Sequence, residues 1–160
     1  MKIRTGFGYD VHRLVADRAL YLGGIRLPHT LGLLGHSDAD VLIHAICDAL
    51  LGAANLRDIG FQFPDTSAEY KNIDSKILLS RTMKLLREEG YELGNIDATV
   101  CAEKPKINPY IDQMKICLAE VMGVNVADIS LKATTSERMG FVGREEGIAA
   151  YATVLIYSVN

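Results

Sequence analysis

The feature that most constrains the fold is the segment over residues 36–48, which indicates the start of a mostly apolar helix whose ionisable side chains share one stripe. A helix turns once every 3.6 residues, so Asp40, His44 and Asp48, each four apart, fall on a single narrow stripe. Most of the remaining helix surface is apolar. The pattern therefore predicts a central helix that ends near residues 52–55 and is buried on nearly all sides.

The residues just before this helix are polar and suited to its N-terminus. Ser37 or Asp38 can cap the first turn, which would leave His36 beside backbone N–H groups that favour an anion. A histidine on an apolar helix is more often a core residue with a satisfied hydrogen bond than a metal ligand. This segment alone therefore leaves both interpretations of His44 open.

Composition limits the class of protein. The 160 residues are 49% hydrophobic, which fits one domain over residues 1–160 with a substantial core. The net charge of −3 gives no broad basic surface for nucleic acid or anionic membrane, and no apolar run approaches the length that spans a bilayer. Three cysteines without a C-x-x-C motif favour free thiols and a cytoplasmic location.

Alternation over residues 3–12 predicts a strand whose end carries two potential ligands. Asp10 and His12 project to the same side of this strand, and Gly6 and Gly8 would let another backbone approach that side. With His44 they supply one oxygen and two nitrogen ligands from two rigid elements. Three protein ligands and an open fourth position are typical of catalytic rather than structural zinc.

The remaining pattern predicts an α+β fold. The other expected elements are a hairpin over 19–28, a loop over 31–35, a helix from Asn72 or Asp74 to about Glu89, a strand over 96–102, a helix capped by Asn108 and ended by Gly123, a strand over 129–133 and a central strand over 148–159. We expect two layers, one mixed sheet with helices on one face. The other face would be buried sheet to sheet in an oligomer.

Two irregular segments are candidates for ligand binding. The loop over residues 56–66 carries apolar side chains among turn residues and fits either a binding lid or an ordered connector. The second segment could cradle a phosphate and a divalent cation, and comprises Lys104, Lys106, Lys132, Thr134, Thr135, Glu137 and residues 140–144. The competing interpretation is a helical capping box from Thr134 to Glu137, which Gly140 and Gly143 disfavour.

Five separated segments carry a resemblance to a known family. They are Gly8-Tyr9-Asp10-Val11-His12, residues 33–41, Asp58-Ile59-Gly60 with Phe63-Pro64-Asp65, residues 132–137 and residues 140–144. In order and along the whole chain they resemble the 2-C-methyl-D-erythritol 2,4-cyclodiphosphate synthase family. The resemblance implies a homotrimeric lyase of the non-mevalonate isoprenoid pathway, cytoplasmic, or plastid if a leader was removed.

The resemblance also implies a reaction and residue roles. The substrate 4-diphosphocytidyl-2-C-methyl-D-erythritol 2-phosphate would give the cyclodiphosphate and CMP. Asp10, His12 and His44 would bind one Zn²⁺ per subunit, and Glu137 a Mg²⁺ or Mn²⁺ on the diphosphate. His36 and Thr135 would be the catalytic groups. The implied substrate-binding residues, in active sites between subunits, are Asp10, His12, His36, Ser37, Asp58, Ile59, Gly60, Phe63, Asp65, Ala102, Lys106, Thr134, Thr135, Glu137, Phe141 and Arg144.

Some positions depart from the family pattern, and other functions remain open. Tyr9, Ala39, Glu145 and the pair Glu103-Lys104 differ from the residues usual in the family, but none removes a group that does chemistry. The alternatives are a zinc phosphodiesterase acting on a nucleotide ester and a non-catalytic trimeric module that binds nucleotide diphosphates. Relatives also suggest an isoprenoid diphosphate in a three-fold channel near Arg144.

Overall fold

The computed structural model describes residues 1–159, and residue 160, the last of the predicted domain, lies outside the described part. The strands are β1 (Ile3–Ala16), β2 (Leu20–Leu22), β3 (Ile25–Leu27), β4 (Leu31–Leu33), β5 (Tyr91–Cys101), β6 (Ile129–Thr134) and β7 (Gly147–Ser158). The helices are α1 (Val41–Ala54), α2 (Ile59–Gln62), α3 (Ser75–Glu88), α4 (Ile111–Met122) and α5 (Gly140–Gly143), with 3₁₀ turns η1 (Ala68–Tyr70), η2 (Asn108–Tyr110) and η3 (Val126–Asp128).

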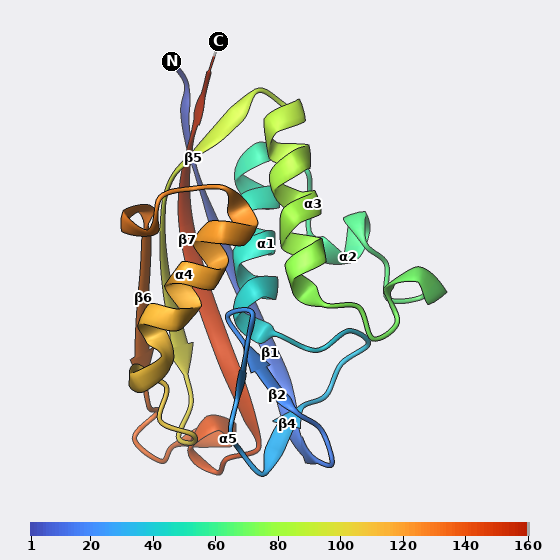
Figure 1. The fold of residues 1–160 in the computed structure, drawn as a ribbon, viewed down its shortest axis with the longest axis vertical. Helices are drawn as coiled ribbons and strands as arrows, with labels where there is room; N and C mark the ends of the chain where they lie inside the picture. Colours follow the sequence, from blue (N-terminus) through green and yellow to red (C-terminus); the bar gives the residue numbers. More distant parts are fainter. Residues whose placement is uncertain (160) are drawn as a thin grey trace.

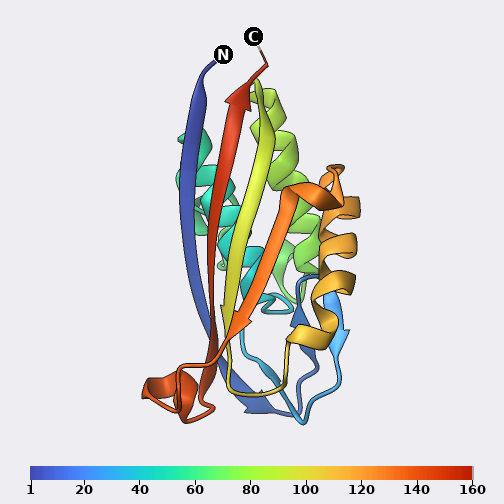
Figure 2. The same cartoon turned by 90° about the vertical axis from the view of Figure 1, so that its left-hand side faces the viewer.

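One mixed sheet forms the first of two layers. Its strand order is β4-β1-β7-β5-β6, in which only β5 and β6 are parallel, and β2 and β3 form a separate hairpin. The long helices α1, α3 and α4 cover one face of this sheet (Figures 1 and 2). The predicted α+β architecture is therefore confirmed, with β7 at the centre of the sheet.

The central helix α1 lies unusually close to strand β1. A Cβ at Gly6 would stand 1.9 Å from the carbonyl oxygen of Ala49, and one at Gly8 would stand 1.9 Å from that of Ala45. The two glycines thus remove the side chains that would hold the helix away from the sheet. As predicted, α1 is buried on almost every side. The close approach places His44 directly opposite the side chains of β1.

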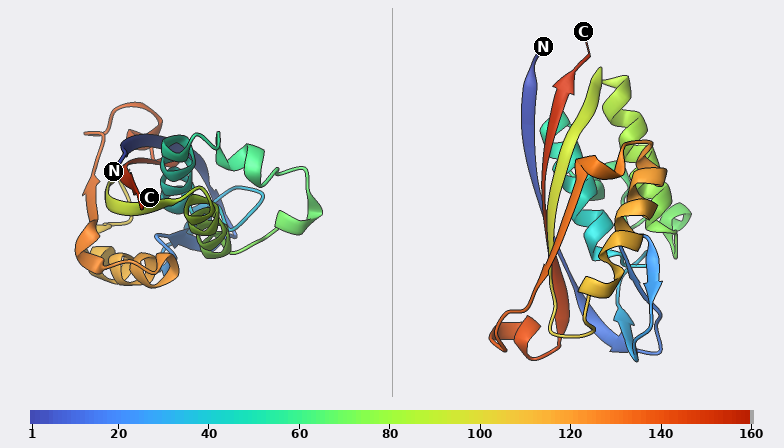
Figure 3. Two further views of the ribbon diagram at one scale, coloured as in Figure 1. Left: turned by 90° about the horizontal axis from the view of Figure 1, so that it is seen from above. Right: turned by 60° about the vertical axis from the view of Figure 1, so that its left-hand side comes forward.

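The other face of the sheet is apolar and open in the single chain (Figure 3). Phe7 is 65% exposed and Tyr9 43%, and the ring of Tyr9 lies 5.1 Å from that of Tyr151. None of the described long helices covers this face. That it is buried in a homotrimer stays a prediction. Among the described residues, no helix is long and apolar enough to cross a bilayer.

Three local predictions were wrong. The expected loop over 31–35 contains β4, which pairs with residues 14–16 of β1. Helix α1 is capped by Asp40, whose carboxylate accepts a hydrogen bond from Ile43 N, and not by Ser37 or Asp38. Asn108 opens the 3₁₀ turn η2, and α4 begins only at Ile111, without a side-chain cap.

Candidate active site

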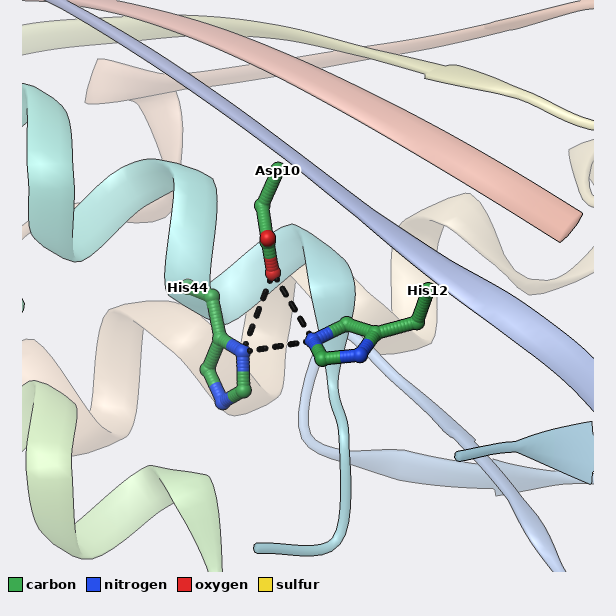
Figure 4. Close-up of side chains that lie close together, drawn as sticks. All are labelled: Asp10, His12 and His44. Carbon is green, nitrogen blue, oxygen red and sulfur yellow. Dashed lines mark hydrogen bonds and ion pairs between the residues drawn. The ribbon is translucent and has the colours of Figure 1, made fainter. Parts of the chain in front are cut away.

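Asp10, His12 and His44 meet between β1 and α1, as Figure 4 shows. Asp10 Oδ2 lies 3.0 Å from His12 Nε2 and 3.1 Å from His44 Nδ1, and the two histidine nitrogens are 3.1 Å apart. All three residues are partly buried. The structure therefore brings together the three ligands that the sequence predicted.

The hydrogen bond at His12 Nδ1 indicates that Nε2 is the nitrogen of His12 that can bind a metal. His12 Nδ1 is 2.8 Å from the carbonyl oxygen of Leu34, which can only accept, so Nδ1 carries a proton and, in the neutral ring that binds a metal, Nε2 has the lone pair. This lone pair faces Asp10 and His44. Tetrahedral zinc holds its nitrogen and oxygen ligands about 3.3 Å from one another. The cluster therefore fits a small divalent cation in both chemistry and spacing.

The charges within the cluster support one another. Burial alone disfavours the charge on Asp10, but in the metal-free site the contacts with the rings of His12 and then His44 outweigh burial and lower the pKa of Asp10. Burial also opposes a charge on His12, yet in the metal-free site its hydrogen bond with Asp10 raises the pKa of His12, and a bound metal ion would take the place of the Nε2 proton. Asp10 is consequently an anion at neutral pH, as a metal ligand must be.

A cavity of about 220 Å³ opens beside the cluster. Its lining includes the predicted residues His12, His36, Ser37, Ile59, Gly60, Phe63 and Asp65, together with His44. Asp58 is not part of the lining, because its carboxylate caps α2 through Phe61 N at 2.7 Å. The loop over 56–66 therefore forms one wall of this cavity.

Sequence reasoning missed part of the opposite wall. Tyr70, Ile73 and Leu78 also line the cavity, and the ring of Tyr70 meets that of Phe63 edge to face at 5.7 Å. Tyr70 ends the short 3₁₀ turn η1 and Ile73 lies in the irregular segment before α3, where no periodic pattern indicates which side chains turn inward. An aromatic residue in an otherwise polar turn was the one available signal.

His36 does not stand at a helix end. Since α1 begins at Val41, the expected anion site formed by His36 and the helix N-terminus is absent from the described structure. His36 is instead held by the neighbouring loop, with Nε2 3.1 Å from the carbonyl oxygen of Ser67 and its own carbonyl accepting from Asn72 N at 2.7 Å. The ring still lines the cavity, with Nδ1 left for a ligand.

A second cavity, of about 180 Å³, lies where the parallel strands β5 and β6 end. Its lining is Ala102, Pro105, Lys106, Ile107, Asn108, Ala133, Thr134 and Thr135. Of the three lysines predicted around an anion, only Lys106 reaches it, because Lys132 pairs with Asp97 and Lys104 with Glu145. Glu137 lies outside the lining and forms no capping box, since its carboxylate accepts from the nearby Thr135 hydroxyl at 3.3 Å.

The remaining predicted residues lie near α5. Phe141 and Glu146 line a third hollow with residues 11–13 of β1. Arg144 binds Glu146 through two contacts, Nε to Oε1 at 2.8 Å and a second guanidinium nitrogen to Oε2 at 3.2 Å. Neither Phe141 nor Arg144 lies in the two cavities described above.

The fold and the site define a class, an α+β enzyme with a carboxylate and two histidines at the mouth of a ligand cavity. Residues 3–157 match the YgbB family, so the chain belongs to that family. It is 77% identical to 2-C-methyl-D-erythritol 2,4-cyclodiphosphate synthase from Parabacteroides distasonis, over 98% of this chain and 97% of the relative.

Solved structures give the same result. The chain matches the bifunctional IspDF from Campylobacter jejuni with a TM-score of 0.96 and 42% identity, over 99% of this chain but only 43% of the longer protein. It matches the CDP complex of IspF from Plasmodium falciparum with a TM-score of 0.87 and 32% identity, over 99% of this chain and 97% of that one. The resemblance inferred from the sequence motifs is confirmed.

Proposed function

We propose that the two cavities are the two halves of one active site, built around the Asp10, His12 and His44 cluster. The activity is that of the family: a lyase of isoprenoid precursor biosynthesis that converts 4-diphosphocytidyl-2-C-methyl-D-erythritol 2-phosphate to 2-C-methyl-D-erythritol 2,4-cyclodiphosphate and CMP. The observation that carries the residue assignment is the convergence of three metal-binding atoms beside the first cavity. We place this activity in the cytoplasm.

The reaction needs little covalent chemistry from the protein. An oxygen of the 2-phosphate forms a bond to the β-phosphorus, while the bond from that phosphorus to the bridging oxygen breaks and CMP leaves with the electron pair. Nucleophile and leaving group belong to the same substrate. Catalysis therefore consists mainly of folding the substrate and neutralising charge that moves between its oxygens.

The first cavity binds the methylerythritol phosphate portion in this proposal. Asp10, His12 and His44 would hold one zinc ion per subunit, which supplies Lewis-acid polarisation of the β-phosphate when bound. His36 and Ser37 line the cavity, where the Ser37 hydroxyl can donate a hydrogen bond to a phosphate oxygen. His36 donates to Ser67 O through Nε2, so it can donate to phosphate through Nδ1 only as an imidazolium with a proton on both nitrogens. Phe63 and Ile59 exclude water from one side of the ligand.

The second cavity binds the nucleotide portion. The cavity lined by Ala102, Pro105 and Ala133 would take the base, and Lys106 places a positive charge beside a phosphate. The hydroxyls of Thr134 and Thr135 can bind diphosphate oxygens, with Glu137 holding Mg²⁺ or Mn²⁺ against them. The CDP complex of the Plasmodium falciparum relative supports a cytidine nucleotide as the ligand.

A homotrimer would unite the two halves. The two cavities of one chain have no lining residue in common, so we assign the substrate to a site between subunits. Each site would then combine the metal cluster of one chain with Thr134 and Thr135 of its neighbour.

Product analysis with the nucleotide substrate tests this function. Cyclic diphosphate and CMP support it, whereas hydrolysed monophosphates indicate a phosphodiesterase and unchanged substrate a binding module.

His44→Ala tests the metal assignment. The substitution removes one of three ligands, so zinc content should fall from one ion per chain to near zero and activity by more than about 100-fold. The fold and assembly should persist, because β1 and α1 pack through neighbouring apolar residues. Metal analysis and size-exclusion chromatography measure both effects. Full zinc content in the variant would contradict the assignment.

Lys106→Ala tests the nucleotide half separately. Loss of a charge-assisted contact should weaken CMP binding by roughly 10- to 100-fold and leave the zinc content unchanged. The matched control is Lys104→Ala, which removes an exposed lysine two residues away that pairs with Glu145. Calorimetric titration with CMP compares the two variants. Equal affinity in Lys106→Ala and the parent would place the nucleotide elsewhere.

A further inference from the structure

A line of polar contacts runs from the metal cluster into the protein on the far side of His44. His44 Nε2 lies 2.9 Å from Ser75 Oγ, and the Ser75 hydroxyl also contacts Asp38 Oδ1. The backbone N–H of Ser75 donates to Asp38 Oδ2 at 3.0 Å. Ser75 is the first residue of α3 and is fully buried. The line therefore connects the segment before α1, the start of α3 and His44.

The available donors and acceptors determine which group donates and which accepts in each hydrogen bond of this line. Both oxygens of Asp38 already accept from backbone N–H groups, those of Ser75 and Asp40. An ionised carboxylate only accepts, so the Ser75 hydroxyl donates to Asp38 and has a lone pair left to accept from His44 Nε2. A neutral imidazole protonated at Nε2 keeps its lone pair on Nδ1. Nδ1 is the atom that faces Asp10 and His12.

We infer that Asp38 and Ser75 are positioning residues that hold His44 in the tautomer and ring orientation required to bind the metal. This inference rests on the proposed metal site and extends it to the residues behind it. Groups that bind the second nitrogen of a ligating histidine commonly set metal affinity. Ser75 is not a nucleophile here, because it is fully buried and does not line the cavity that would hold the substrate.

A second hydroxyl lies close enough to His44 that removal of Ser75 should weaken zinc binding without abolishing it. Ser37 Oγ lies 3.2 Å from His44 Nε2 and also accepts from Ala39 N at 3.1 Å. In Ser75→Ala, Ser37 can still accept weakly from the ring, so the histidine loses its better partner but keeps a fold-compatible environment. Zinc affinity should fall by about 10- to 100-fold.

Asp38→Asn should reverse the donor and acceptor roles along this line of hydrogen bonds while the side-chain volume at position 38 stays almost constant. If the amide oxygen accepts from Ser75 N, the amide NH₂ faces the Ser75 hydroxyl, which must then donate to His44 Nε2 instead. The ring proton moves to Nδ1, where it opposes a metal ion. Zinc affinity should therefore fall at least as far as in Ser75→Ala. In the double variant the losses should not add, because both substitutions break the same line.

The experiment measures zinc binding to the apoprotein by competition with a chromophoric chelator. It compares the parent, Ser75→Ala, Asp38→Asn and the double variant. Asp74→Asn is the matched control, since it removes a carboxylate at the same helix start that caps Lys76 N without contact to His44. Circular dichroism and urea unfolding confirm that each variant is folded. We expect weaker binding in the three test variants and parental binding in the control.

A spectroscopic measurement on the parent does not depend on any variant being folded. In the zinc-loaded parent, a proton–nitrogen NMR spectrum should show His44 Nε2–H protected from exchange with solvent. A rapidly exchanging Nε2–H, or parental zinc affinity in Ser75→Ala and Asp38→Asn, overturns the positioning role alone. If the parent apoprotein binds no zinc, the proposed metal site fails and the positioning role fails with it.

Discussion

Three side chains spaced four residues apart in the sequence have three different roles. Asp40 precedes α1 and is fully buried, and its carboxylate accepts from the N–H groups of Gly23, Gly24 and Ile43. His44 belongs to the metal cluster, and Asp48 accepts from Ile59 N at 2.8 Å. Equal spacing placed these residues on one stripe, but the helix start at Val41 removes Asp40 from it. The helix cap Asp40 thus anchors the β2–β3 turn, and the two residues left on the stripe serve the metal cluster and α2.

Asp40→Ala should destabilise the fold strongly. The substitution leaves three N–H groups, two of them buried, without their acceptor and removes the cap of the central helix. We expect a loss of about 2–4 kcal/mol in the free energy of unfolding. Asp74→Ala, which removes the exposed cap of α3, should cost only about 1 kcal/mol. Urea unfolding of both variants measures the difference, and equal losses would contradict a buried anchoring role for Asp40.

At the scale of elements, the sequence predicted what depends on local pattern. The long helices, the hairpin and the central strand follow from periodicity and from glycine stops within their own residues. The sequence did not reveal β4, whose three residues carry no strand period and gain their partner only from β1. The start of α1 was misplaced because Asp38 binds Ser75, 37 positions away, instead of capping its own helix.

The metal cluster was predictable because each ligand lies on a regular element. The i, i+2 spacing of Asp10 and His12 gives one face of a strand, and the glycines beside them indicate where a helix approaches. The cavity walls were less predictable, since Tyr70 ends a short 3₁₀ turn and Ile73 lies in irregular chain. The inward direction of Tyr70 depends on its contact with Phe63 in the loop over 56–66, which no local pattern encodes.

Glu103 now has a structural role that its sequence position did not reveal. Its carboxylate accepts from Ser136 N at 3.1 Å, from Ser136 Oγ at 3.3 Å and from Arg138 N at 3.0 Å. These contacts join the turn after β5 to the loop after β6, and both border the second cavity. The backbone donors lower the pKa of Glu103, so it remains ionised.

Glu103→Ala should raise KM for the nucleotide substrate. Without this acceptor, residues 136–138 lose three hydrogen bonds to the turn after β5, which leaves the Thr135 hydroxyl less firmly placed beside Lys106. We expect KM to rise between about 10- and 100-fold with zinc content unchanged. Lys104→Ala, which breaks only an exposed ion pair, should stay within about twofold of the parent. Steady-state kinetics separates the two, and a parental KM in Glu103→Ala would exclude the positioning role.

At the scale of the whole molecule, the open sheet face and the α5 segment lie on the same side. Figure 2 shows α5 projecting from the end of the sheet, away from the long helices. In the proposed homotrimer, three apolar faces carrying Phe7 and Tyr151 would surround the axis. The Arg144–Glu146 pairs of the three chains would then gather near one end of an apolar channel.

This arrangement predicts a channel ligand with an apolar tail and an anionic head, such as an isoprenoid diphosphate. Three arginines near one axis repel unless each is paired, and Glu146 already supplies a bidentate partner in the single chain. A diphosphate must therefore compete with Glu146 for the guanidinium groups. Arg144→Ala should abolish binding of farnesyl diphosphate, whereas Glu146→Gln should strengthen it by freeing Arg144.

Calorimetric titration of parent and variants with geranyl and farnesyl diphosphate measures this competition. The parent should bind one ligand per three chains, because all three arginines serve a single head group. A stoichiometry of one per chain would assign the ligand to the active site instead. No binding in the parent, or equal binding in parent and Arg144→Ala, excludes the arginine-lined site and leaves Arg144–Glu146 as an ion pair between neighbouring surfaces.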